Sequence, residues 1–237
     1  MAELPDPDGV PDCLRLTRRG AVGLLQLHRP AKRNALDDAT IAALHGFFAA
    51  PPAELRAVVL HGAGAHFCAG LDLSELTSRS VIEGIAHSRA WHRAFEQIQF
   101  GAVPVVALLH GAVVGGGLEL AAAAHVRVAE RTAFYALPEA SRGIYVGGGG
   151  SVRLPPLIGT ARVMDMMLTG RTLGAEEGQA IGLTQYLVDE GEGLAKGMEL
   201  VDAVRDAKAY VSSAIAAADQ LKIGSGRGPL HHFSKWW

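Results

Sequence analysis

Three consecutive glycines within an apolar stretch constrain the fold of this chain more than any other feature of its sequence. The stretch spans residues 103–124 and is interrupted by His110, by the three glycines at 115–117 and by Glu119. These interruptions leave no apolar run long enough to cross a bilayer. Glycine allows close backbone approaches and conformations that other residues resist. The pattern therefore predicts a buried strand that ends before the glycines and a helix that begins at them.

Strands and helices alternate along most of the chain. Strands are expected at residues 21–28, 55–60, 104–109 and 126–129, and helices at 39–48, 81–100, 118–124, 160–168, 175–181 and 192–221. Asp37 or Asp38 is expected to cap the first helix. The alternation predicts parallel βαβ units, and hence an α/β fold whose C-terminal part is helical. We expect a flexible arm over residues 1–12, a core over 13–190 and a helical region with an atypical tail over 191–237.

The composition excludes several functional classes. The chain has 22 Lys and Arg against 24 Asp and Glu, a net charge of −2, which offers no broad attraction to nucleic acid or to an anionic membrane. Cys13 and Cys68 are the only cysteines, too few for a disulfide framework. Residues 1–12 lack the basic start and apolar core of a signal peptide. We expect a cytoplasmic protein that binds neither nucleic acid nor membrane.

The glycine-containing turn has a chemical use. The first N–H groups of a helix have no partner within the helix and lie at its positive end. They can therefore stabilise an oxygen that becomes negative during a reaction. The loop around Gly70 and Leu71, which follows the strand at 55–60, can supply a second N–H. Two such donors directed at one thioester oxygen would stabilise an enolate.

These segments resemble the enoyl-CoA hydratase/isomerase (crotonase) superfamily over about residues 24–188. The run Phe-Cys-Ala-Gly-Leu-Asp at 67–72 is similar to its first oxyanion loop, and Gly-Gly-Gly-Leu-Glu at 115–119 to its second. The resemblance implies that the backbone N–H groups of Leu71 and Gly116 bind the thioester oxygen. It also implies a spiral of repeated ββα turns that form two sheets with helices outside, assembled as a homotrimer or a dimer of trimers.

Two glutamates occupy the positions at which the hydratase branch carries its acids. Glu119 lies two residues after the last glycine of the triplet, and Glu139 directly follows Pro138. The resemblance implies that Glu119 deprotonates a water molecule while Glu139 supplies a proton to the α-carbon. Acid catalysis near neutral pH requires a raised carboxyl pKa, which burial or a neighbouring carboxylate can provide. The function expected is hydration of a short-chain 2-enoyl-CoA in fatty acid metabolism.

The substrate is expected to bring its own CoA, so the resemblance implies no separate cofactor. The residues expected to contact the substrate or its CoA part are Lys32, Arg33, Ala35, Ala69, Asp72 and Gly115. Lys32 and Arg33 could pair with CoA phosphates or be solvated turn charges. His61, His66 and His110 lack metal-ligand spacing, so no metal is expected.

Other functions stay open at this level. The segment 137–150 has Val146 where hydratases tend to have proline, and it resembles the (methylthio)acryloyl-CoA hydratase branch, which is associated with thioester hydrolysis after hydration. A single glutamate that shuttles a proton would make the protein an enoyl-CoA isomerase. The sequence after Val188 departs from the family, which would suit a non-catalytic acyl-CoA-binding subunit. Phe233, Trp236 and Trp237 in this tail could dock on a neighbour or cover a pocket.

Three further features have both a structural and a functional interpretation. The glycines at 147–150 are interpreted as a loop whose backbone approaches the acyl group, or as a purely structural turn. Trp91 and Tyr135 are candidates for the acyl pocket, with core packing the favoured role for Trp91. A nucleophilic role for Cys68 is disfavoured because no histidine is evidently paired with it.

Overall fold

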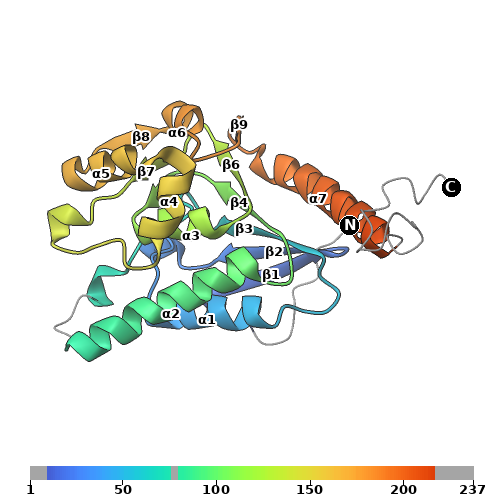
Figure 1. The fold of residues 1–237 in the computed structure, drawn as a ribbon, viewed down its shortest axis with the longest axis horizontal. Coiled ribbons are helices and arrows are strands. Elements are labelled where there is room, and N and C mark those ends of the chain that lie inside the picture. Colours follow the sequence, from blue (N-terminus) through green and yellow to red (C-terminus); the bar gives the residue numbers. More distant parts are fainter. Residues whose placement is uncertain (1–9, 76–79, 217–237) are drawn as a thin grey trace, which may run out of the picture.

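Two β-sheets form the centre of the computed structural model, which describes residues 10–75 and 80–216 (Figure 1). The larger sheet has the strand order β1 (Leu14–Arg19), β2 (Val22–Leu27), β3 (Ala57–Gly62), β4 (Val105–Leu109), β6 (Val126–Glu130), β9 (Tyr186–Val188). The smaller sheet has the order β5 (Ala112–Val114), β7 (Phe134–Ala136), β8 (Thr172–Gly174). Strands β2, β3, β4, β6 and β9 pair in parallel, whereas β1–β2 and β7–β8 are antiparallel. The α/β prediction is confirmed.

Seven α-helices connect and cover the strands. They are α1 (Asp38–Ala49), α2 (Val81–Phe100), α3 (Gly116–Ala123), α4 (Gly150–Ile158), α5 (Thr160–Thr169), α6 (Ala175–Ile181) and α7 (Gly193–Ala216) within the described ranges. Asp37, one of the two expected caps, accepts the N–H of Thr40 and begins α1. Ser80 and Glu83 form a capping box that begins α2.

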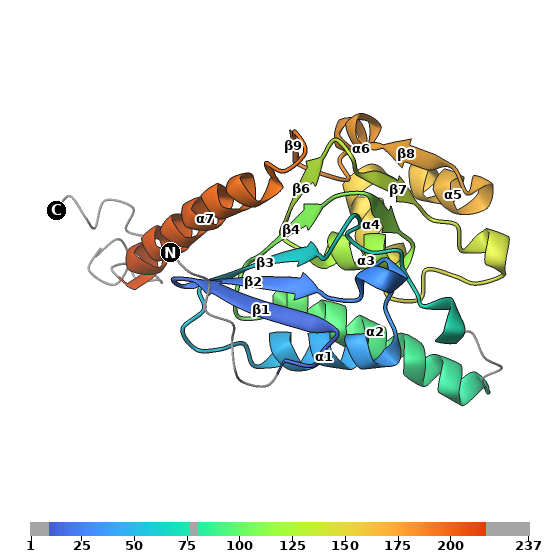
Figure 2. The same ribbon diagram turned by 180° about the vertical axis from the view of Figure 1, so that it is seen from behind.

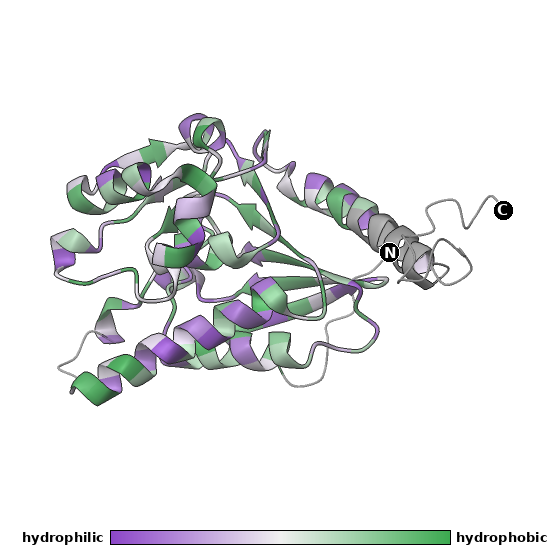
Figure 3. Ribbon diagram, in the orientation of Figure 1, coloured by the Kyte–Doolittle hydropathy of each residue, from purple (hydrophilic) through white to green (hydrophobic). Residues whose placement is uncertain are grey.

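The central strands of the larger sheet are buried along most of their length, because helices cover both of its faces. One face packs against α1, α2 and α3 around Phe48, Phe95 and Leu120. The other face packs against α7 through Leu194, Met198 and Val201, the last of these among Val22, Leu24, Val59, Val106 and Leu108. Figure 2 shows α7 leaving the strands at the opposite end from α5 and α6. Apolar residues follow the strands in Figure 3, whereas α2 alternates hydrophilic and apolar residues along its length.

The structure corrects the expected elements in several places. Strands β1, β5, β7, β8 and β9 and helix α4 were missed. Four of these strands have three residues each, too few to show an alternating pattern. Helix α4 begins at a glycine and contains Pro155 and Pro156. Glycine and proline in a sequence indicate a loop rather than a helix. The expected arm up to residue 9 and the tail from residue 217, with Phe233, Trp236 and Trp237, lie outside the described residues.

Two negative findings apply to the ranges 10–75 and 80–216. No helix there is long and apolar enough to span a membrane. No group of three or more His, Cys, Asp or Glu side chains there is arranged to hold a metal ion.

Candidate active site

The two glycine-containing loops lie side by side because their backbones are hydrogen-bonded to each other. The N–H of Phe67 donates to the carbonyl of His110 over 2.8 Å, and that of Cys68 to Ala112 over 2.9 Å. The N–H of Val114 returns a bond to the carbonyl of Cys68 over 3.1 Å. Segments that are more than forty residues apart in the sequence are thereby joined as a short parallel ladder.

Asn34 fixes the first of these loops from the other side. Its side chain is 1% exposed and its φ of +55° lies in the left-handed region, which asparagine tolerates better than most residues. Its Nδ2 donates to the carbonyls of Ala63 and His66 over 2.9 and 2.7 Å, and its Oδ1 accepts the N–H of Arg29 over 3.0 Å. This buried anchoring role of Asn34 was not expected from the sequence.

Asp72 is engaged within the protein rather than with the cavity. Its carboxylate accepts from Ser74 and lies 2.9 Å from the Arg29 guanidinium, which also pairs with Asp37 over 3.0 Å. The Ser74 hydrogen bonds, together with Arg29, lower the pKa of Asp72 to about 2. Asp72 therefore holds the loop to the start of α1.

The backbone nitrogens of Leu71 and Gly116 lie close together where the two loops meet. A Cβ on Gly70 would lie 3.2 Å from the nitrogen of Gly116, and one on Gly116 would lie 3.5 Å from the nitrogen of Leu71. Gly70 and Gly115 have φ of +91° and +53°, which explains why the sequence needs glycine there. Within the described hydrogen bonds, neither the Leu71 nor the Gly116 N–H has an acceptor. The pair is available to a ligand oxygen.

Glu119 lies in the first turn of α3 and is 3% exposed. Its Oε1 accepts the N–H groups of Gly148 and Gly150 over 2.9 and 2.7 Å. Burial is the main cause that raises its pKa, and the carboxyl of Glu139 raises it further, whereas the two N–H donors and Arg153 oppose the rise. The resulting pKa of Glu119 is about 7.

Glu139 stands before a single 3₁₀ turn (Ala140–Arg142) and is 5% exposed. Its Oε2 is buried without a hydrogen-bond partner among the described residues. Burial raises the pKa of Glu139 above the ordinary glutamate value. A backbone hydrogen bond opposes this rise, whereas Oε2 has no donor among the described residues to stabilise a charge on it.

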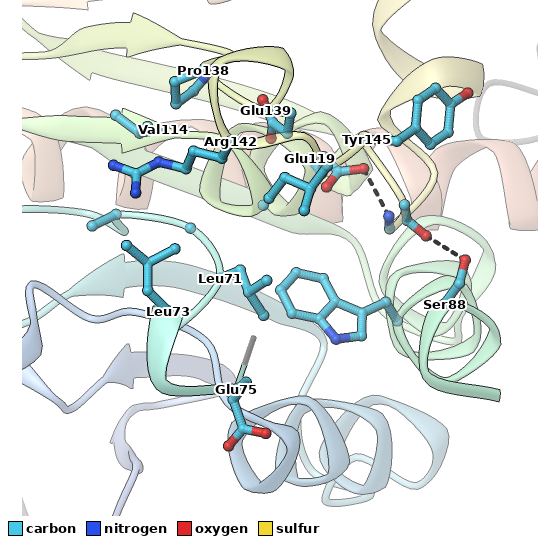
Figure 4. A pocket seen from close by; sticks show the side chains of 18 of the residues that line it. Leu71, Leu73, Glu75, Ser88, Val114, Glu119, Pro138, Glu139, Arg142 and Tyr145 are labelled. Atoms are coloured by element: carbon cyan, nitrogen blue, oxygen red, sulfur yellow. Dashed lines mark hydrogen bonds between the residues drawn. The ribbon is translucent and has the colours of Figure 1, made fainter. Parts of the chain in front are cut away.

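A cavity of about 240 Å³ lies between these groups (Figure 4). Glu119 and Glu139 face it together with the backbone of Leu71 and Gly116. Its remaining wall is mainly apolar and includes Leu73, Trp91, Val114, Pro138, Ile144 and Tyr145. The arrangement combines two acids of raised pKa with two free N–H donors in a partly apolar pocket.

Comparison with known proteins identifies the family. Residues 17–222 match the family model described as enoyl-CoA hydratase/isomerase. The chain belongs to the enoyl-CoA hydratase/isomerase family. It is therefore an enzyme of the hydratase/isomerase type, and the resemblance noted in its sequence is confirmed. The match continues to residue 222, so the expectation that the sequence departs from the family after Val188 is wrong.

Individual members of the enoyl-CoA hydratase/isomerase family match most of the chain. A solved structure of a candidate enoyl-CoA hydratase from Rhodopseudomonas palustris is 52% identical, has a TM-score of 0.81 and covers 90% of this chain and 84% of its own. The short-chain-enoyl-CoA hydratase of Clostridium acetobutylicum is 30% identical over 90% of this chain and 80% of its own length. An enoyl-CoA isomerase/hydratase of Penicillium crustosum is 34% identical over 89% of this chain, which spans only 24% of that longer protein.

The hydratase/isomerase site gathers most of the residues expected from the sequence. Residues Glu119, Glu139, Leu71, Gly116, Ala69 and Gly115 all line the cavity. Lys32 and Arg33 lie outside it, exposed at the turn before Asn34, and Ala35 is buried with its carbonyl bonded to Arg29. Their contact with CoA stays a prediction, as does that of Asp72.

The side chains of Trp91, Tyr135 and Cys68 lie in different environments. Trp91 is 4% exposed and packs against Phe95, yet its ring also lines the cavity. Tyr135 does not line the cavity, so its expected place in the acyl pocket is wrong. It is fully buried beneath α6, where a Cβ on Gly178 would lie 2.2 Å from its ring. Burial raises the pKa of Cys68 to about 12, so its thiol stays protonated and is a poor nucleophile.

Proposed function

We propose that the protein adds water across the double bond of a short-chain 2-enoyl-CoA. The observation that carries this proposal is the pairing of two buried carboxyl groups of raised pKa on the wall of one cavity with two unoccupied N–H groups. An isomerase needs only one group that moves a proton, whereas hydration needs one group for the water and another for the α-carbon. The pair therefore favours hydration.

The Leu71 and Gly116 donors would bind the thioester oxygen. As hydroxide adds to the β-carbon, the electron pair of the double bond moves toward that oxygen and an enolate forms. Hydrogen bonds directed at the position where this charge develops lower the barrier, typically by about 3–4 kcal/mol per donor. The helix dipole of α3, whose N-terminus contains Gly116, adds to this effect.

The surroundings of the two glutamates support a division of labour between them. Two N–H groups stabilise a negative charge on Oε1 of Glu119, which suits a carboxylate that takes a proton from water. Oε2 of Glu139 has no donor among the described residues to stabilise a negative charge, which suits a group that delivers a proton. We therefore assign the proton from water to Glu119 and the proton delivered to the α-carbon to Glu139. After one turnover the pair still carries one proton, which is now on Glu119 instead of Glu139.

The size of the cavity supports a short acyl chain. Its volume of about 240 Å³ lies below the roughly 300–1,000 Å³ usual for sites that hold larger ligands. The match to a short-chain-enoyl-CoA hydratase points in the same direction.

Incubation with crotonyl-CoA in D₂O tests the proposal against its alternatives. We expect 3-hydroxybutyryl-CoA with one deuterium at the α-carbon. Deuterium exchange or double-bond migration without a hydroxyacyl product would instead support an isomerase, an activity that the name of one relative includes. Release of free CoA from methylthioacryloyl-CoA would add a hydrolytic step.

A further inference from the structure

The glycine loop beside Glu119 is held from behind by side chains that do not touch that carboxyl group. The peptide unit between Gly147 and Gly148 is trans, so its C=O and N–H point in opposite directions in one plane. The Gly148 N–H donates to Glu119. The Gly147 carbonyl, at the other end of the same unit, accepts the hydroxyl of Ser88 over 2.7 Å, as Figure 4 shows. Ser88 on α2 therefore sets the direction of one donor to Glu119.

Arg153 holds the next peptide unit. Its Nη1 donates to the carbonyl of Gly148 over 3.1 Å, and its Nε donates to Oε1 of Gln99 on α2 over 2.7 Å. The side chain is 8% exposed, and its positive charge also favours the carboxylate form of Glu119. Arg153 thus links α4 to α2 around the glycine loop.

The surroundings of the loop leave little room for side chains at Gly148, Gly149 and Gly150. A Cβ on Gly150 would lie 2.7 Å from Cγ of Glu119, and one on Gly149, whose φ is +100°, would lie 2.2 Å from Nη1 of Arg153. One on Gly148 would lie 3.0 Å from the ring of Trp91. The loop therefore fits closely between Glu119 and α2, and its residues Gly147 and Gly148 also line the cavity. Its approach to the acyl group stays a prediction.

We infer that Ser88 and Arg153 are positioning residues that act on Glu119 through the backbone of Gly147 and Gly148. Ser88 fixes the carbonyl end of the peptide unit whose N–H, that of Gly148, donates to Oε1 of Glu119. Arg153 fixes the following unit, which lies between the two donors Gly148 and Gly150 and holds them in place relative to each other. Both residues thereby maintain Glu119 as the reactive carboxylate. This inference rests on the proposed function, in which Glu119 takes the proton from water.

The pH dependence of turnover gives the readout that a merely structural role would not move. The charged and titratable groups around Glu119 and its loop are Glu139, Arg153, Arg142, His87, His92 and Glu96. Among the described residues, only the Ser88 and Arg153 side chains bond the loop carbonyls at Gly147 and Gly148. In Ser88→Ala, the misdirected N–H of Gly148 is expected to raise the acid limb of the kcat profile by about one pH unit. In Arg153→Met, the loss of a positive charge near Glu119 adds to a shift in the same direction, so Ser88→Ala is the variant that isolates positioning. It should also lower kcat on the order of 10-fold with little change in KM.

Matched variants separate positioning from loss of fold. Ser80→Ala removes the hydroxyl that caps α2, and Arg162→Met removes an arginine that bonds the carbonyl of Ile158; neither side chain contacts the glycine loop. We expect these controls to lower Tm without moving the pH profile. Ser88→Thr should recover most of the rate, because it restores a hydroxyl donor.

A double-mutant cycle with Glu119→Gln completes the test. If Ser88 acts through Glu119, adding Ser88→Ala to Glu119→Gln should cost little further activity. An equal loss in both backgrounds, or an unchanged pH profile in both Ser88→Ala and Arg153→Met, would overturn the inference. If Glu119→Gln itself turns over like the wild type, the proposed function fails instead; if it is inactive while both positioning variants behave as wild type, only the inference fails.

Discussion

Gly115 and Glu139 face each other so closely that a methyl group on Gly115 would lie 2.8 Å from Oε1 of Glu139. Gly115 also has a φ of +53°, which side-chain-bearing residues rarely adopt. The glycine before α3 therefore serves two purposes: it turns the chain into the helix and leaves space for the carboxyl group that we propose as the proton donor.

Replacement of Gly115 by alanine is expected to displace Glu139 and to strain the turn. We expect Gly115→Ala to lower kcat for crotonyl-CoA by at least about 10-fold, because small misplacements of catalytic groups are costly. Gly46→Ala on α1 is the control, since a Cβ there has nothing within 4 Å and the helix gains a better helix former. Gly46→Ala should keep wild-type kcat, and equal kcat in both variants would contradict the account of Gly115.

The raised pKa of Glu119 predicts how stability changes with pH. Between about pH 4.5 and about pH 7 the folded protein holds a proton on Glu119 that the unfolded chain has released. Stability from this group is therefore present in full below pH 4.5 and is lost as pH rises to about 7. Glu119→Gln removes that loss, which amounts to about 3 kcal/mol. The Tm of Glu119→Gln minus the Tm of wild type should be more positive at pH 8 than at pH 5. A Tm difference that does not change with pH would contradict a raised pKa of Glu119.

Arg127 on β6 is expected to stabilise the helix that carries Glu119. It is 3% exposed and donates to the carbonyls of Ala124 and Leu183 over 2.7 and 2.8 Å. Arg127→Met would leave these carbonyls unpaired, and we expect a loss of about 2–4 kcal/mol in denaturant unfolding. Arg131→Met, in the turn directly after β6, is the control, because the Arg131 side chain pairs only with exposed Glu176 and Asp189 among the described residues. These two exposed ion pairs should contribute little to the free energy of unfolding. Similar losses of that free energy in Arg127→Met and Arg131→Met would contradict the role of Arg127.

Substitution of Lys32 and Arg33 tests whether the protein recognises the phosphates of CoA through these two side chains. If they pair with its phosphates, Lys32→Ala with Arg33→Ala should raise KM for crotonyl-CoA several-fold without lowering kcat. The effect should shrink at high ionic strength, because exposed charges are screened. KM for crotonyl-pantetheine, which lacks the phosphates, should not change. A rise in KM for both substrates would indicate a structural role for the turn.

Local features allowed the main residues of the cavity wall to be predicted from the sequence. Gly116 is the middle residue of a glycine triplet and Glu119 lies two residues after the triplet, whereas Glu139 directly follows a proline. The support around them could not be predicted in the same way. Ser88 is an ordinary helix residue until the fold brings Gly147 against it, fifty-nine positions later in the chain. Short strands such as β5 form because the neighbouring strand pairs with them, and not because of their own pattern.

Single-turnover hydration of crotonyl-CoA by Glu119→Gln and by Glu139→Gln tests the central claim most directly. Each change keeps the shape of the side chain and removes its proton chemistry. The account predicts that each variant still binds the substrate and that each loses on the order of 10²–10⁴-fold in rate. A rate within a few-fold of wild type in either variant would contradict the assignment of these two carboxyl groups as the acid/base pair.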